Sequence, residues 1–374
     1  MFSHLHVVSI RRTCLFFLGC GSSLLSCSTH PTTDTSSEVI HTSYQAGMSD
    51  ISFIDDRGKE LLMTVWYPTI VEDNRTPDAY EPFTIAINAY KATAPVVKNA
   101  PLVAFSHGFF SIRYQSAFLM EHLAEQGFVV VAVDHPYNTL YDFDDSKTGK
   151  VLLERPDDVR SAVDKLTELN HTSTDPFYQM VDDTQYVAMG HSFGSHTASV
   201  LGGGELDYEG LERFCEENPS ERACNYLDTI QTEDLSSFGA SDARVTATIP
   251  ISPGLWYTFG ENGEGLENVR NPLLIAGTRD DVLEYETEAL PFFAALDSPK
   301  VLFSMFNTGH YGMTNICDIA SFLSPECTED GWESVIEVQT ATNNILSGFL
   351  RSHFMGIEFE YTDMEREWLT ATYE

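Results

Sequence analysis

Short apolar runs and amphipathic segments alternate along the chain from about residue 100 onward. The apolar runs predict strands that are buried on both faces, because few polar positions interrupt them. Between them, residues 115–126 and 157–169 carry apolar side chains at helical spacing, and residues 333–353 predict a closing helix. This alternation predicts an α/β fold with a mostly parallel central sheet and helices on both faces. The expected strands are residues 102–105, 128–133, 186–189, 245–251, 273–276 and 301–305.

Two further segments depart from this alternation. Residues 51–54 and 61–67 predict strands on either side of the turn at residues 55–58, and so an N-terminal antiparallel hairpin. Residues 202–242 fit no regular unit, and we expect an insertion over the active edge of the sheet there. Residues 49–374 are therefore expected to form one domain that carries this insertion.

The first residues predict an export signal over residues 1–26. Arg11 and Arg12 precede an apolar run that is too short to span a bilayer as a permanent helix. Residues 24–27, Leu-Leu-Ser-Cys, resemble a bacterial lipobox, so we expect lipid on Cys27, with Cys20 as the rival site and an ordinary cleaved signal as the alternative. A Ser- and Thr-rich tether over residues 27–48 would follow. The expected location is the bacterial cell envelope, at the periplasm or outer membrane and anchored through the lipid, or otherwise the secreted fraction.

Four cysteines lie in the body of the chain. In an oxidising compartment an even number of cysteines can pair, and the local pairs are Cys215–Cys224 and Cys317–Cys327. The two other connectivities stay open. Neither pair has the spacing of metal ligands, so no metal is expected.

Charge changes the picture of possible partners. Lys and Arg number 21 against 56 Asp and Glu, which gives a formal net charge of −35. Such a surface repels phosphate backbones, so nucleic-acid binding is excluded, and it disfavours acidic substrates. The oligomeric state has no marker in the sequence.

One motif carries candidate chemistry. Residues 190–194 are Gly-His-Ser-Phe-Gly, directly after an expected strand and before a helix-like segment. This pattern is typical of a nucleophile elbow, in which Ser192 sits on a strained turn and the glycines avoid collisions that a Cβ would cause. The backbone N–H of Phe193 would then donate to a developing oxyanion.

A serine nucleophile needs a base and an acid, which in this architecture follow in the order serine, acid, histidine. His310 lies in a loop after the expected strand 301–305 and is the expected base. Asp280 and Asp281 both follow the strand 273–276, and we favour Asp280 as the acid over Asp281. No organic cofactor is expected.

The loop after residues 102–105 should complete the site. It reads Ser-His-Gly-Phe-Phe over residues 106–110, and the N–H of Phe109 is the expected second oxyanion donor. Aromatic residues on loops near this edge predict an apolar substrate pocket. The expected pocket residues are Phe110, Trp256, Tyr257 and Tyr311.

Together these residues resemble the α/β-hydrolase superfamily, and within it predicted dienelactone hydrolases and plasma-type platelet-activating-factor acetylhydrolases. The resemblance covers roughly residues 49–354 and rests on the elbow, on Trp-Tyr-Pro at 66–68, on Gly127–His135 and on Arg155-Pro156-x-Asp158. It implies ester hydrolysis through a serine acyl-enzyme without a cofactor. The chain departs from it in having a serine where dienelactone hydrolases use cysteine, Ser195 in place of a second glycine, and no carboxylate after residues 245–251.

We therefore expect a serine carboxylic-ester hydrolase that acts on uncharged or lipid-like esters. One alternative is a lipid-anchored binding protein on a hydrolase scaffold that has lost its chemistry. The other is an amidase or peptidase that uses the same triad.

Overall fold

The computed structural model describes residues 44–72, 74–80, 88–230 and 241–374. The expected signal, Cys20 and Cys27 lie outside these residues. β1 begins at Gln45, inside the segment that was expected to be a tether. Within the described residues, no helix is both long enough and apolar enough to cross a membrane.

The described strands form one ten-stranded sheet in the order β10-β9-β8-β7-β6-β4-β5-β2-β1-β3. The pairs from β5 through β4, β6, β7 and β8 to β9 are parallel, whereas β1 and β10 pair antiparallel with β2 and β9. The strands are β1 (Gln45–Ile54), β2 (Glu60–Thr69), β3 (Ala89–Lys91), β4 (Leu102–Ser106), β5 (Val129–Val133), β6 (Tyr186–His191), β7 (Val245–Ile251), β8 (Leu273–Gly277), β9 (Val301–Met305) and β10 (Leu369–Tyr373).

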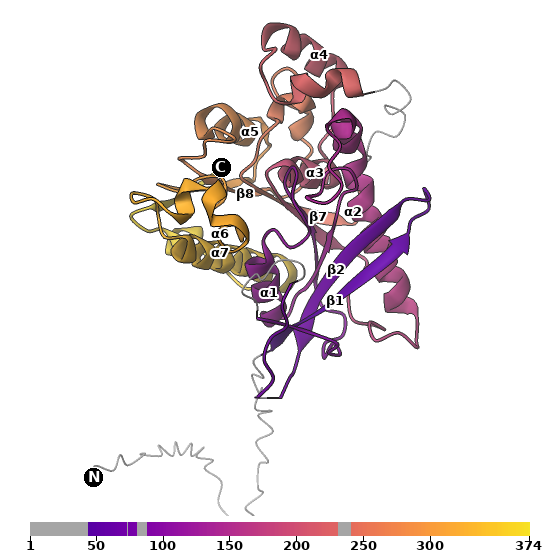
Figure 1. The fold of residues 1–374 in the computed structure, drawn as a ribbon. Helices are drawn as coiled ribbons and strands as arrows, with labels where there is room; N and C mark the ends of the chain where they lie inside the picture. Colours follow the sequence, from indigo (N-terminus) through magenta and orange to yellow (C-terminus); the bar gives the residue numbers. More distant parts are fainter. Residues whose placement is uncertain (1–43, 73, 81–87, 231–240) are drawn as a thin grey trace, which may run out of the picture. The chain divides into compact units, whose positions relative to one another are not determined.

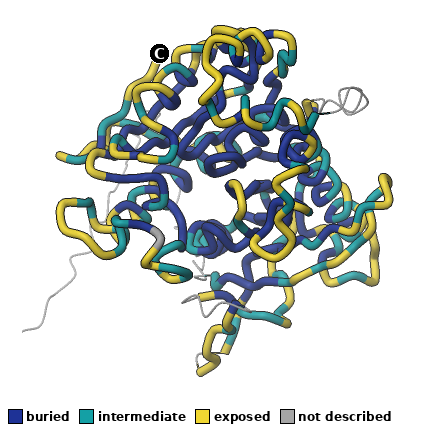
Figure 2. Tube along the Cα trace, turned by 45° about the horizontal axis from the view of Figure 1, so that its top comes forward, coloured by how far each residue is buried: buried dark blue, intermediate teal, exposed yellow. Residues whose placement is uncertain are grey.

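Helices cover both faces of this sheet (Figure 1). The helices are α1 (Ala117–Glu125), α2 (Thr148–His171), α3 (Phe193–Gly202), α4 (Tyr208–Glu217), α5 (Leu290–Ala295), α6 (Ile316–Ala320) and α7 (Val335–Met355). α1 and α7 pack on one face, where Leu123 and Phe349 share a core cluster with Val103 of β4. α2 and α3 pack on the other face, where Val163 joins a second cluster with Ala104. Because neighbouring residues of β4 enter opposite clusters, the strand is buried on both sides. Figure 2 shows that buried segments run through the interior and that most exposed segments lie at the periphery.

The fold class expected from the sequence is confirmed, including the hairpin of β1 and β2. All six expected strands of the parallel sheet are present with ends shifted by at most two residues. The expectation that residues 202–242 lack regular structure is wrong in part, because α4 forms there. The helix begins where Asp207 accepts a hydrogen bond from the N–H of Gly210 at 2.9 Å.

Two disulfides crosslink loops near the carboxyl ends of the strands. Cys215 at the end of α4 pairs with Cys224, and Cys317 in α6 pairs with Cys327. These are the two local pairs expected from the sequence. Two disulfides in one chain are typical of a protein that folds in an oxidising compartment outside the cytoplasm, so they suggest an exported protein.

Candidate active site

Ser192 sits at the tight turn between β6 and α3. Its φ is 56° and its ψ is −121°, a conformation that costs strain energy in a residue with a side chain. A Cβ on Gly190 would lie 2.0 Å from the carbonyl oxygen of Gly194. A Cβ on Gly194 would lie 1.9 Å from the carbonyl oxygen of Ser106. Glycine is thus required at both positions for the turn to close against the end of β4.

Two backbone N–H groups beside Ser192 are candidate oxyanion donors. Phe193 is the first residue of α3, so its N–H has no acceptor within the helix, and Phe109 lies in the loop after β4. Across the described residues, neither N–H has a hydrogen-bond acceptor. Gly108 brings the β4 loop close to the serine, since a Cβ there would lie 3.4 Å from that of Ser192.

His310 and Asp280 form a buried pair. His310 Nδ1 lies 2.7 Å from Asp280 Oδ2, so the ring donates to the carboxylate through Nδ1–H and keeps Nε2 as an acceptor. The other carboxylate oxygen of Asp280 accepts the N–H groups of Val282 at 2.8 Å and Leu283 at 2.7 Å. Asp281 is exposed and makes no hydrogen bond to His310, so the structure brings Asp280 to the histidine.

A chain of hydrogen bonds connects the loops after β4, β6 and β9. Gln115 accepts the N–H of Gly108 through Oε1 and donates through Nε2 to His191 Nδ1, at 2.5 and 2.6 Å. His191 Nε2 lies 2.8 Å from the carbonyl oxygen of His310 and donates to it. Full burial lowers the pKa of His191 well below its usual value, and the neighbouring His310 lowers it further. His191 is therefore neutral and connects Gln115 to the His310 loop by hydrogen bonds. The sequence analysis gave this residue no role of its own.

Arg155 lies fully buried beneath the same loops. Its guanidinium donates to Asn138 Oδ1 at 2.8 Å, to Thr197 Oγ1 at 3.1 Å and to the carbonyl oxygen of His107. The guanidinium carbon also lies 4.5 Å from the ring centre of Phe193. A buried cation requires such partners, and here they come from the loops after β4 and β5 and from α3.

Ser192 and His310 open onto one cavity of about 790 Å³. No hydrogen bond joins Ser192 Oγ to His310 in the described structure, and catalytic hydrogen bonds commonly tighten only when substrate is present. The expected pocket residues Phe110 and Tyr311 line this cavity, as do Phe109 and Phe193. The insertion and the segment at α6 supply much of the remaining wall, through Leu211, Arg222, Ala223, Asn225, Tyr226, Ile230, Ile316, Ile319, Ala320 and Phe322.

The wall of the cavity is mostly apolar, and its mouth is aromatic. Phe109 and Phe110 are 40% and 44% exposed, and Phe322 is 83% exposed. Phe143 packs its ring edge against both Phe109 and Phe110. Among the described lining residues, Arg222 is the one Lys, Arg, Asp or Glu.

Trp256 and Tyr257 correct the sequence expectation, because neither is among the described residues that line the cavity. Tyr257 is fully buried and stacks on Phe214 of α4, with ring centres 4.4 Å apart. Trp256 packs edge-on against Phe214 and donates its ring N–H to the carbonyl oxygen of Thr287. Both side chains therefore pack against α4 of the insertion. The sequence pattern did not predict this helix, so it could not indicate this packing.

In the described part of the chain, no group of three or more His, Cys, Asp or Glu side chains could hold a metal ion. The chemical groups gathered at the cavity are instead a serine, a histidine with its carboxylate and two unpaired N–H groups. That set is the one used in acyl transfer.

Comparisons with known proteins establish the fold. The solved structure of a ferulic acid esterase from Streptomyces cinnamoneus is similar, with a TM-score of 0.58, 20% sequence identity and coverage of 89% of this chain and 97% of that chain. The protein therefore has the α/β-hydrolase fold. A family model described as PET hydrolase-like matches residues 87–207, which include the loop after β4 and the turn at Ser192, and this match supports hydrolase activity at the level of that family. The comparison with curated proteins gives no match.

We predict that Gln115→Ala destabilises the protein. The change leaves the N–H of Gly108 and His191 Nδ1 buried without partners, so we expect the free energy of unfolding to fall by about 2 kcal/mol. Chemical denaturation measures this. Gln185→Ala is the control, because Gln185 is half-buried with one long hydrogen bond to Asp182, and its loss should stay within about 0.5 kcal/mol. Equal losses in the two variants would contradict the prediction.

Proposed function

We propose that this protein is a serine carboxylic-ester hydrolase with Ser192, His310 and Asp280 as its triad. The observation that carries the proposal is the opening of Ser192 and the Asp280-paired His310 onto one cavity. The strained turn at Ser192 adds weight, because such strain persists only where the surrounding structure maintains it.

In this mechanism Ser192 Oγ attacks the ester carbonyl carbon and His310 Nε2 takes the hydroxyl proton. Asp280 holds the imidazole in the Nδ1–H tautomer and stabilises the imidazolium. The N–H groups of Phe109 and Phe193 bind the oxyanion of the tetrahedral intermediate. His310 then gives its proton to the leaving alcohol, and water releases the acyl group from Ser192 by the same steps in reverse order.

The substrates we propose are uncharged or lipid-like esters. The aromatic mouth and apolar wall favour apolar groups on either side of the ester, since their burial is stabilising. The net charge of −35 disfavours substrates that carry several negative charges.

The proposed mechanism makes a prediction about the nucleophile. A fluorophosphonate probe should label the purified protein and should not label Ser192→Ala, because the probe reacts with an activated serine. The wild-type protein should also hydrolyse nitrophenyl esters and should hydrolyse the matching anilides far more slowly. Labelling of Ser192→Ala, or no labelling at all, would refute a serine hydrolase and leave a binding protein. Equal or better turnover of anilides would indicate an amidase.

The second prediction concerns the acid. Asp280→Asn should lower kcat by about 10³- to 10⁴-fold, because an amide no longer favours the required tautomer of His310. Asp281→Asn is the matched control, since it makes the same change in the exposed neighbour, and it should stay within about twofold of the wild type. Steady-state kinetics on a nitrophenyl ester measures both. The reverse ranking would overturn the assignment of Asp280.

We also propose that the protein is exported and anchored through lipid on Cys27. The two disulfides support export, and the lipobox-like residues 24–27 support lipidation. Expression in a bacterium supplied with an alkyne fatty acid should give a labelled protein in the membrane fraction. Cys27→Ala should lose the label, whereas Cys20→Ala should keep it; the opposite result would move the lipid to Cys20, and an unlabelled wild-type protein would indicate a plain secretory signal.

A further inference from the structure

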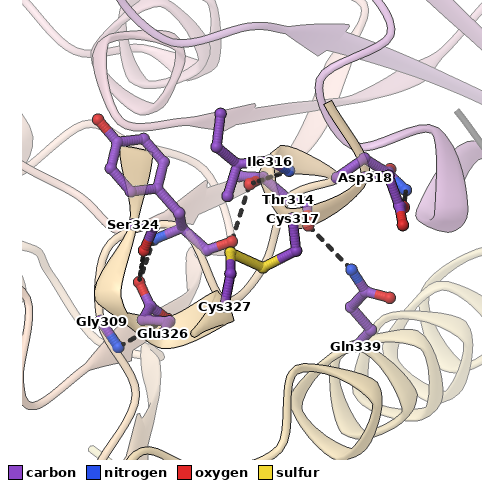
Figure 3. The surroundings of a disulfide bond; sticks show 11 residues. Gly309, Thr314, Ile316, Cys317, Asp318, Ser324, Glu326, Cys327 and Gln339 are labelled. Atoms are coloured by element: carbon purple, nitrogen blue, oxygen red, sulfur yellow. Dashed lines mark hydrogen bonds between the residues drawn. A yellow bond between two sulfur atoms is a disulfide. The ribbon is translucent and has the colours of Figure 1, made fainter. Parts of the chain in front are cut away.

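The segment that follows α6 turns back onto the loop of His310. The disulfide between Cys317 and Cys327 closes this segment, and Figure 3 shows the bond with Glu326 and Gly309 beside it. The chain just before α6 is held as well, because the carbonyl oxygen of Thr314 accepts a hydrogen bond from Gln339 of α7 at 2.9 Å. The crosslink thus holds residue 327 close to the histidine loop.

Glu326 accepts hydrogen bonds from that loop on both sides of His310. Its Oε2 accepts the N–H of Gly309 at 3.0 Å and its Oε1 accepts the N–H of Tyr311 at 2.9 Å. The hydroxyl of Ser324 donates to Oε1 at 3.4 Å. One carboxylate therefore fixes the N–H groups of the two residues that flank the proposed base.

The loop is shaped to admit this carboxylate. A Cβ on Gly309 would lie 2.5 Å from Glu326 Oε1, and a Cβ on Gly312 would lie 2.8 Å from Oε2. The Gly-His-Tyr-Gly run at residues 309–312 thus has a physical reason, since any side chain at either end would push the carboxylate away.

The same segment meets the loop of the acid. Arg279, next to Asp280, donates to the carbonyl oxygen of Gly331 at 2.6 Å, and its guanidinium carbon lies 3.8 Å from the ring centre of Trp332. The backbone N–H of Arg279 also donates to the carbonyl oxygen of Thr308. The segment from Ser324 to Trp332 therefore contacts the loops that carry both proposed partners of Ser192.

Resting on the proposed esterase activity, we propose that Glu326 is a positioning residue for His310. Its carboxylate fixes the backbone on both sides of the imidazole and places a second negative charge near the ring. Asp280 holds the ring from Nδ1, while Glu326 holds the main chain that carries the ring. The Cys317–Cys327 disulfide keeps the carboxylate at this position.

The electrostatic surroundings agree with this role. Burial raises the pKa of Glu326, while the two N–H groups and the neighbouring His310 act in the opposite direction and favour the carboxylate. Asp280, Tyr311 and neutral His191 also face the ring of His310, and Asp281 and Arg222 lie near Tyr311. Among these groups Asp280 and Glu326 bear the negative charges that stabilise a protonated His310 most directly.

The test replaces the charge without changing the shape. Glu326→Gln should lower kcat/KM on a nitrophenyl ester by about 10- to 100-fold, almost all of it in kcat, because the base is held less firmly while the cavity is unchanged. The acid limb of the kcat/KM profile should move down by about 0.5 pH unit, since the protonated form of His310 loses a nearby negative charge. Glu329→Gln is the matched control, because it removes the same charge from an exposed position three residues away, and it should change neither quantity.

A second variant separates the effect of the negative charge at position 326 from the effect of the two hydrogen bonds that its carboxylate accepts. Glu326→Asp keeps the charge but is too short to accept both N–H groups, so kcat should fall while the acid limb stays in place. This variant also carries the test if Glu326→Gln shows no cooperative thermal unfolding.

Two results would overturn the role of Glu326. One is a Glu326→Gln or Glu326→Asp protein with wild-type kcat, and the other is a folded Glu326→Gln protein whose kcat falls without a shift of the acid limb. Failure of the proposed esterase itself would look different, because the wild-type protein would then have no hydrolysis that depends on Ser192.

Discussion

The hydrogen-bond chain that runs from Gly108 through Gln115 and His191 to His310 is the interaction on which the site depends. Parallel strands bring their carboxyl ends to one edge of a sheet, but they do not fix the loops beyond those ends. This chain joins the loops after β4, β6 and β9 through the side chains of Gln115 and His191, which are buried and neutral. Each link satisfies a polar group that would otherwise be buried alone, so loop geometry and stability have a common origin.

Two charged side chains fix the same loops in addition to this hydrogen-bond chain. Arg155 connects the loop after β4 to α3, and Glu326 accepts hydrogen bonds from the loop that carries His310. Both bond mainly to main-chain atoms or to small hydroxyl and amide groups, and these hydrogen bonds offset part of the cost of burying each charge. The loops that carry Ser192 and His310 are therefore fixed without a ligand, and the proposed acyl transfer requires preorganisation of this kind.

The parts that follow from local pattern could be predicted from the sequence. Continuous apolar runs identified the buried strands, and the glycines beside Ser192 identified the turn, because both depend on neighbouring residues alone. The sequence did not predict α4, because polar residues dominate it and no long apolar run marks it, and Trp256 and Tyr257 were expected in the pocket although they pack against that helix. Gln115 and Glu326 could not be found, because each acts on residues that are remote in sequence; the glycine at each end of residues 309–312 was the one available signal for Glu326.

The two disulfide-closed segments differ in how freely they can diverge during evolution. The segment closed by Cys215 and Cys224 forms part of the cavity wall through Ala223 and Tyr226, and its crosslink spans nine residues. Under the proposed function, substitutions in this segment can alter which substrates fit without disturbing proton transfer by His310. The segment closed by Cys317 and Cys327 also carries Glu326, which is bonded on both sides of His310, so under the proposed function variation there acts on turnover and on selectivity together. Natural diversification of substrate range in proteins built like this one should accumulate in the first segment and spare the second.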